Sequence, residues 1–212
     1  MTRVAILFLC LLALLVVWRY SSRQPEASVA ATHPRSARVE GSTIYFVPIG
    51  DFPREQFDPL VRYYHQKYGL DITVLKSIPA DPATRDASRQ QLMAENLAAS
   101  VHSAFPEHAS DPKAILIGVT SEDMYPVSKN WQFAFTWRSG ANRTAVVSTA
   151  RLRLPNTADS SDPDVPGTRL RKMVTKDIGL LYYGLAQSAD PKSVLYNQIM
   201  GIEELDNVGE DF

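Results

Sequence analysis

The sequence predicts an α/β fold, a three-layer sandwich built around a mixed sheet. β-rich apolar runs alternate with helical patterns between residues 43 and 120, an order typical of parallel strands joined by helices. The run Lys113–Thr120 (KAILIGVT) is apolar almost throughout, as expected of a central strand covered on both faces. Two more strand-like runs, Trp131–Trp137 and Thr144–Thr149, follow without a helix between them, so a strand pair completes the sheet.

The first strand and the first helix have clear boundary signals. Thr43–Ile49 (TIYFVPI) is a β-rich run, and Asp58-Pro59 supplies an N-cap and a first-turn proline for the helix that follows. Gly69 ends this helix. Its apolar stripe consists of Leu60, Tyr64 and Tyr68. His65 lies on the helix but off the stripe, so we expect a solvated or capping role for it rather than metal binding.

A second strand and a long helix are predicted next. Asp71–Ile78 (DITVLKSI) has strand character, and after a proline-bounded loop Arg85–Phe105 is predicted to form an amphipathic helix. The buried stripe of that helix consists of Leu92, Met93, Leu97, Val101 and Phe105.

The N-terminus contains an unbroken apolar run, Val4 to Trp18, followed by Arg19 and Arg23. Its length suits both a signal-peptide core and a short transmembrane helix. No small-residue cleavage site follows closely, so we expect a single-pass membrane anchor or uncleaved signal over residues 1–20, with cleavage near Ala31 as the alternative. Residues 21–41 have no hydrophobic period and predict a flexible linker. The globular domain then spans residues 42–212, and we expect it to be extracytoplasmic.

Composition argues against several classes of function. The formal net charge is −1, which leaves no long-range field to gather a nucleic acid. Cys10 is the only cysteine and lies in the apolar run, so the globular domain has no disulfide, no thiolate ligand and no thiol chemistry. The histidines are His33, His65, His102 and His108.

Several motifs occur in an order known from one family. Ile117–Pro126 (IGVTSEDMYP) is a strand with a following turn, and Gln132–Trp137 (QFAFTW) is an aromatic strand. Ala145–Leu152 (AVVSTARL) is a strand followed by Ser-x-x-Arg-Leu. Together with the Ile44–Gly50 strand, this series resembles the archaemetzincins, small zinc-dependent peptidases of the metzincin clan. The resemblance implies a metzincin-like sandwich with a twisted mixed sheet and a former active-site helix.

Arg169–Ser188 (RLRKMVTKDIGLLYYGLAQS) resembles the helix that binds zinc in that family. There, the signature H-E-x-x-H-x-x-G-x-x-H supplies three imidazoles and a general-base Glu. When Arg169 and Lys172 are placed on the family's Arg and Lys, every functional position of the signature is substituted. The substitutions are Lys176 at the first His, Asp177 at the Glu, Leu180 at the second His, and Ala186 or, with one inserted residue, Gln187 at the third His.

The family's second, four-cysteine metal site is also substituted. Ser188 and Ser193 stand at two of its cysteines, and Leu195 replaces the methionine of the Met-turn. The resemblance therefore implies a degenerate member: a pseudoenzyme of a zinc-metallopeptidase family with no metal, no cofactor and no catalytic residue. We expect a membrane-tethered module that binds a peptide or protein partner, or a domain whose role is purely structural.

Two catalytic alternatives stay open. One is a hydrolase with a rebuilt site that uses Ser148, Lys176 or Asp177, although none of these has a recognised catalytic spacing. The other is a zinc peptidase with ligands borrowed from His65, His102 or His108. For Lys176 and Asp177 we expect a solvated lysine and a salt-bridged or helix-capping aspartate.

Overall fold

The computed structural model describes residues 43–155 and 164–212. All described residues belong to one compact unit. The predicted anchor over Val4 to Trp18 and the linker over residues 21–41 lie outside the described residues. Among the helices of the described part, none has the length and apolar character needed to cross a membrane.

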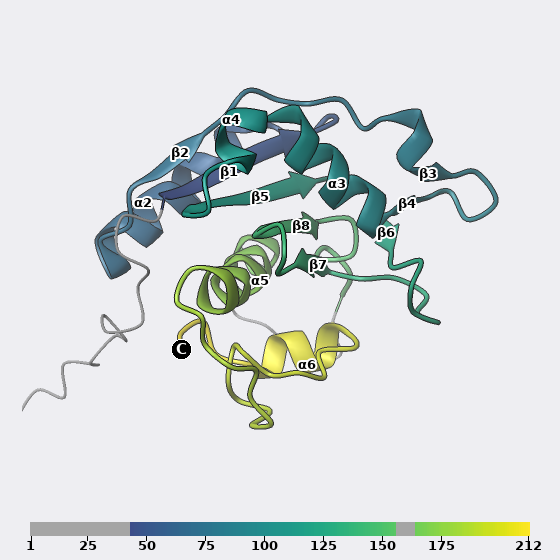
Figure 1. Cartoon of the computed structure of the whole chain (residues 1–212). Coiled ribbons are helices and arrows are strands. Elements are labelled where there is room, and N and C mark those ends of the chain that lie inside the picture. The colour runs from purple at the N-terminus through teal and green to yellow at the C-terminus, as the bar shows by residue number, and fades with distance from the viewer. Residues whose placement is uncertain (1–42, 156–163) are drawn as a thin grey trace, which may run out of the picture. The chain divides into compact units, whose positions relative to one another are not determined.

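A five-stranded mixed sheet forms the centre of the domain (Figure 1). Its strands, in spatial order, are β2 (Ile72–Val74), β1 (Thr43–Ile49), β5 (Ala114–Thr120), β8 (Thr144–Ser148) and β7 (Thr136–Ser139). The first four run parallel, and β7 pairs antiparallel with β8 at the edge. Every residue of β5 is buried, as its apolar sequence predicts.

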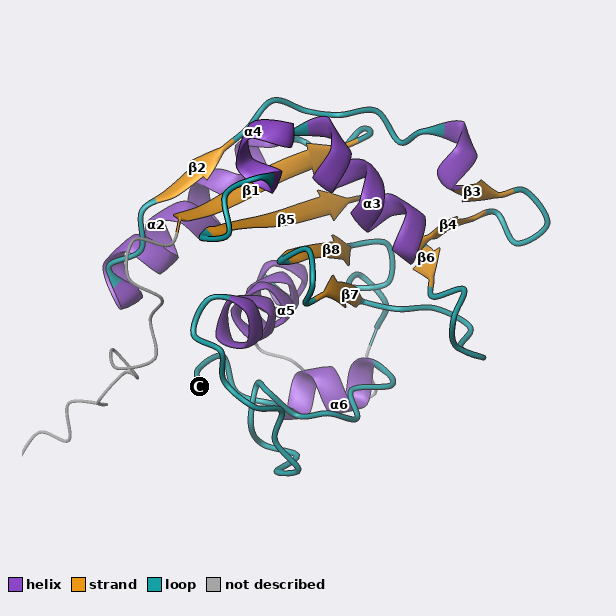
Figure 2. Cartoon of the chain, viewed as in Figure 1, coloured by secondary structure: helices purple, strands orange, loops and turns teal. Residues whose placement is uncertain are grey.

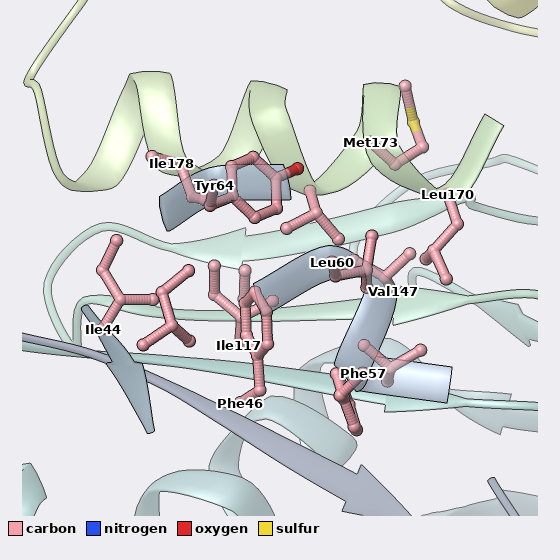
Figure 3. Packing of buried hydrophobic residues seen from close by; sticks show 14 of the residues in the cluster. Ile44, Phe46, Phe57, Leu60, Tyr64, Ile117, Val147, Leu170, Met173 and Ile178 are labelled. Atoms are coloured by element: carbon pink, nitrogen blue, oxygen red, sulfur yellow. The ribbon is translucent and has the colours of Figure 1, made fainter. Parts of the chain in front are cut away.

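Helices cover both faces of this sheet, and the core is divided accordingly. On one face, α2 (Phe57–Tyr68) and α5 (Val165–Leu181) pack on alternate strand residues such as Phe46, Ile117 and Val147 (Figure 3). On the other face, α3 (Ala94–Ala104), which is followed by the short α4 (Pro106–Ala109), packs on the intervening residues. The predicted three-layer α/β sandwich is therefore confirmed.

The C-terminal segment after α5 is mostly loop and contains one short helix, α6 (Ile202–Asn207) (Figure 2). Arg169, which is 2% exposed, fastens this segment to α5. Its Nε and Nη2 each donate to Asp206 at 2.7 Å, and its Nη1 donates to the carbonyls of Leu152 and Leu154. A buried guanidinium with four hydrogen bonds fixes the position of the segment that faces α5.

One predicted helix begins nine residues later than expected. Residues 85–93 form β3 (Arg85–Asp86), a turn and β4 (Gln91–Met93) instead of the first turns of the Arg85–Phe105 helix. The Asp86 carboxylate accepts from the Ser88 backbone N–H, which stabilises the turn. Strand β4 pairs with β6 (Met124–Tyr125) in a second, three-stranded sheet. Tertiary pairing therefore overrides the helical pattern.

Two predicted strands are shorter than expected. Asp71–Ile78 is a regular strand only over β2. Beyond it the Leu75 and Ile78 N–H groups still donate to the Phe46 and Pro48 carbonyls of β1, while the Arg54 guanidinium takes the carbonyls of Val74 and Leu75. The predicted strand Trp131–Trp137 begins only at Thr136. Before it, the Phe135 carbonyl still accepts from the Ser148 N–H of β8 at 2.9 Å. Ala134 pairs elsewhere, since its N–H donates to the Met124 carbonyl at 2.8 Å. Two 3₁₀ turns, at Arg54–Gln56 and Pro82–Thr84, complete the described elements.

Helix α2 matches its prediction at the C-terminal end, but the predicted N-cap at Asp58 is wrong, because the turn Arg54–Gln56 runs directly into a helix that begins at Phe57. It ends at Gly69, whose φ of +64° is the left-handed conformation that favours glycine at a helix C-cap. The His65 side chain is 65% exposed and lies 3.2 Å from the Asp71 carboxylate. The predicted solvated role of His65 is confirmed.

Candidate functional site

Helix α5 presents the candidate site, and its N-terminus is well defined. Asp164 caps the helix by accepting from the Gly167 N–H at 3.2 Å, and Pro166 occupies the first turn. The helix is buried over most of its length because the sheet covers one side and the C-terminal segment covers the other. At Gly179 a Cβ would lie 2.8 Å from the Leu195 side chain, so only glycine permits this close packing.

Lys176 is buried, with 5% of its surface exposed, so the predicted solvated lysine is wrong. Its ammonium donates a hydrogen bond to the Tyr196 carbonyl. Burial is the main reason that the pKa of Lys176 falls from 10.5 to about 8, and the nearby Arg138 lowers it further. Asp177 acts in the opposite direction. The pKa of the Lys176 amine therefore lies close to neutral pH.

Asp177 is fully buried, and the prediction that it is salt-bridged is confirmed. One carboxylate oxygen accepts from Arg138 Nη1 and the other from Thr136 Oγ1, both at 2.7 Å. Burial raises the pKa of this carboxyl group, while Arg138 and Thr136 oppose the rise. Because both partners lie on β7, Asp177 links α5 to the edge strand.

A pocket opens beside Lys176, between α5, the segment that leads into β7, and the loop after α5. It is a hollow of about 580 Å³, part of it open to solvent. Its lining residues are Trp131, Phe133, Ala134, Phe135, Thr136, Arg138, Met173, Lys176, Gln187, Asn197, Ile199 and Met200. Of the four substituted signature positions, Lys176 and Gln187 line this pocket, Asp177 lies behind it, and Leu180 is half-buried outside the lining.

The substituted positions do not fit a zinc ion. Lys176 carries an ammonium near neutral pH, both oxygens of Asp177 are engaged by β7, and Leu180 has no donor atom. Gln187 offers one amide, which is a poor zinc ligand. Within residues 43–155 and 164–212, no group of three or more His, Cys, Asp or Glu side chains is placed to hold a metal ion. No zinc-dependent step follows from these residues.

The alternative ligands and nucleophile do not join the pocket. His65 lies at the end of α2, and His108 stacks on Tyr45 with ring centroids 4.1 Å apart. His102 is on α3, across the sheet, and its buried Nδ1 has no hydrogen-bond partner among the described residues. The Ser148 hydroxyl donates to the Glu122 carbonyl at 2.7 Å and does not line the pocket.

Arg138 and the aromatic walls of the pocket are site residues that the sequence did not predict. Phe133 and Phe135 pack edge to face at 5.1 Å, and the Arg151 guanidinium stacks over Phe133 at 4.2 Å. The alternation of aromatic residues at 131, 133 and 135 is the signal that could have found them. Such alternation is typical of an edge strand, whereas these residues precede the strand and shape the pocket.

Three solved structures resemble the fold, all below 25% identity. The archaemetzincin of Archaeoglobus fulgidus, complexed with malonate, has a TM-score of 0.63 at 20% identity and covers 80% of this chain and 94% of its own. The Methanopyrus kandleri archaemetzincin gives 0.62 at 22% identity, covering 84% and 91%. A zinc-dependent peptidase from Methanocorpusculum labreanum gives 0.62 at 18% identity, covering 80% and 95%. They confirm the predicted fold class.

Sequence similarity to a known protein tests the family as well as the fold. No family-level sequence model matches the chain. The archaemetzincin of Haloquadratum walsbyi is 30% identical over 155 residues, which cover 70% of this chain and 83% of the relative. This identity and coverage confirm the resemblance seen in the sequence.

These relatives overturn one prediction. The chain was expected not to be an enzyme, but its relatives are archaemetzincins and one of the solved structures is a zinc-dependent peptidase. The substitutions at 176 and 180 remove zinc donors from α5, yet they are no positive sign of inactivity. The prediction is therefore wrong as a class assignment. By sequence and by fold, the chain belongs to the archaemetzincin family.

Proposed function

We propose that this domain binds peptides in the pocket beside α5. The observation that carries the proposal is the composition of the lining, in which an aromatic wall faces the polar groups of Lys176, Arg138, Gln187 and Asn197. Ligand pockets commonly combine apolar walls with a few convergent polar groups. Amide side chains and cations match the carbonyl and carboxylate groups of a peptide.

The position of the pocket at the sheet edge supports the same proposal. Strand β7 is the last strand of the five-stranded sheet and contributes Thr136 and Arg138 to the lining. An edge strand offers unpaired backbone groups to which an extended segment adds as a further strand. A peptide that runs along β7 would place its side chains against the pocket.

A binding assay with a matched pair of variants tests the proposal. Met200 lines the pocket and is 54% exposed, whereas Val127 is 53% exposed and does not line it. The immobilised full chain is incubated with a pool of randomised decapeptides, and retained peptides are counted by mass spectrometry. Met200→Ser should reduce retention several-fold and Val127→Ser should leave it unchanged. Equal retention by both variants and the wild type, or no retention at all, would exclude peptide binding in this pocket.

A second candidate is peptide hydrolysis with Lys176 as general base. The observation in its favour is the pKa of about 8, since a base is most effective when its pKa lies near the working pH. The neutral amine would take a proton from a water molecule that attacks the peptide carbonyl, releasing a carboxylic acid and an amine. The same decapeptide pool, examined for new termini, tests this candidate. New termini from the wild type but not from Lys176→Met would support it, and a pool that stays intact would refute it.

We also propose that residues 1–20 anchor the domain, residues 42–212, to a membrane with the domain outside the cytoplasm. The apolar run Val4 to Trp18 and the flanking arginines support this proposal. Fractionation of cells should place the full chain in the membrane, and a variant lacking residues 1–20 in the soluble fraction. A mature N-terminus near Ala31 would show cleavage and contradict the anchor.

A further inference from the structure

The Lys176 ammonium has hydrogen-bonding capacity that its surroundings leave unused. An ammonium has three N–H donors, and its single hydrogen bond among the described residues goes to the Tyr196 carbonyl. Asp177 follows it in sequence, but the two carboxylate oxygens of Asp177 point to Thr136 and Arg138. Among the described residues, no carboxylate lies within ion-pair distance of Lys176. Two donors therefore remain for a ligand in the pocket.

The charges around the pocket favour an anion. Lys176 and Arg138 both line it, and the lining contains no Asp or Glu. Asp177 neutralises one of these two cations from behind, so about one positive charge remains unbalanced. A buried ammonium without a counter-ion is unfavourable, and a carboxylate that binds it forms a short, charge-assisted hydrogen bond.

Apolar groups surround the Lys176 ammonium, so the pocket favours a carboxylate that is attached to an apolar group. Met173 and Ile199 line the pocket together with Phe133 and Phe135. The C-terminal residue of a peptide carries a carboxylate and a side chain on the same Cα. Its side chain can therefore fill the apolar space while its carboxylate binds the ammonium. An internal Asp or Glu brings the carboxylate but leaves the apolar walls exposed to water.

The depth of the site also suits a chain end. Lys176 is 5% exposed, while the exposed part of the lining consists of Trp131, Gln187, Asn197 and Met200. A terminus can enter with its last residue, whereas an internal residue must reach Lys176 from a backbone that stays at the rim. We propose that Lys176 binds the C-terminal carboxylate of a peptide whose last side chain is apolar. This rests on the proposed peptide binding, whose ligand it specifies.

Three peptide pools that differ only at the C-terminus test this inference on the full chain. All are randomised decapeptides: the first ends in Leu with a free carboxylate, the second in Leu amide, and the third in Asp amide, which carries its carboxylate on the side chain. The wild type should retain the free acid about tenfold or more over the Leu amide. Lys176→Met should lose this preference, and Lys176→Arg should keep most of it. Val127→Ser is the matched control.

The outcomes separate the inference from the function on which it rests. Equal retention of the Leu acid and the Leu amide would overturn the carboxylate site and leave peptide binding intact. Retention of the Asp amide at the level of the Leu acid would overturn the assignment to the chain end. Failure to retain any pool would refute the proposed function, and the inference with it.

A pH series supplies a readout that a purely structural lysine would not move. The charged groups that face Lys176 are Arg138 on β7 and Asp177 on α5 itself. The loss of the Lys176 proton is the change that acts on a bound carboxylate. The preference for the free acid should fall between pH 7 and pH 10 in the wild type and stay level in Lys176→Arg. A level preference in the wild type would contradict the inference.

Discussion

Replacement of Lys176 by Met should change how the stability of the protein depends on pH. The pKa of Lys176 is about 8 in the folded chain, against 10.5 for a lysine side chain that is fully solvated, as in the unfolded chain. Between these two values the unfolded chain binds more protons than the folded chain, so stability rises with pH. Below pH 8 both states are protonated, and the full cost of burying the ammonium opposes folding.

The size of this effect follows from the pKa shift. A shift from 10.5 to about 8 corresponds to about 3 kcal/mol of destabilisation at pH 7. The same values leave about 1.5 kcal/mol at pH 9.5. Lys176→Met removes this dependence, although it also leaves the Tyr196 carbonyl without its donor, which costs about 1 kcal/mol at every pH. The pH-dependent part is therefore the informative quantity.

Urea unfolding of the wild type and Lys176→Met at pH 7 and pH 9.5 measures this pH-dependent part of the stability. From pH 7 to pH 9.5, the free energy of unfolding of the wild type should rise by about 2 kcal/mol relative to that of Lys176→Met. Other lysines and tyrosines also titrate in this range, but they cancel in the difference between the two proteins. A difference that stays the same at both pH values would refute the assignment of a shifted pKa to Lys176.

The remaining predictions concern the framework that positions the pocket. Arg169→Met should destabilise the protein by about 3–5 kcal/mol, because it removes the bidentate hydrogen bonds from the guanidinium to the Asp206 carboxylate. Urea unfolding measures the loss, and a change below about 1 kcal/mol would contradict the role of the pair. Gly118→Ala should cost about 1–3 kcal/mol, since the new Cβ would lie 2.6 Å from Ile49 Cδ1 and 2.9 Å from Val101 Cγ2. A thermal midpoint of Gly118→Ala equal to that of the wild type would contradict this packing.

The parts of the fold that the sequence predicted correctly are those with local signals. Gly69 ends α2 as expected, and the apolar run over β5 is a fully buried central strand. The predicted start of α3 was wrong because Leu92 and Met93 pair with residues more than thirty positions away, and no local pattern records that pairing. No local pattern records either that the Arg54 guanidinium, from a neighbouring turn, takes the carbonyls at the end of β2.

At the site, the sequence identified the substituted positions but not their environment. Asp177 was expected to form a salt bridge, but its partner Arg138 lies on another element and could not be named. Lys176 was expected in solvent because a lysine is seldom buried. Its burial follows from the C-terminal segment that covers α5 and brings the Tyr196 carbonyl to the ammonium, an arrangement set by tertiary packing.

Helix α5 presents an ammonium for a ligand carboxylate, on our proposal, at the place where the family's signature presents imidazoles for zinc. A crystal structure of the full chain, grown with the free-acid peptide that the pools select, tests this most directly. The predicted result is a C-terminal carboxylate oxygen within about 3 Å of Lys176 Nζ, with the last side chain against Phe133 and Phe135. A peptide bound elsewhere, or a zinc ion bound to α5, would contradict the proposal.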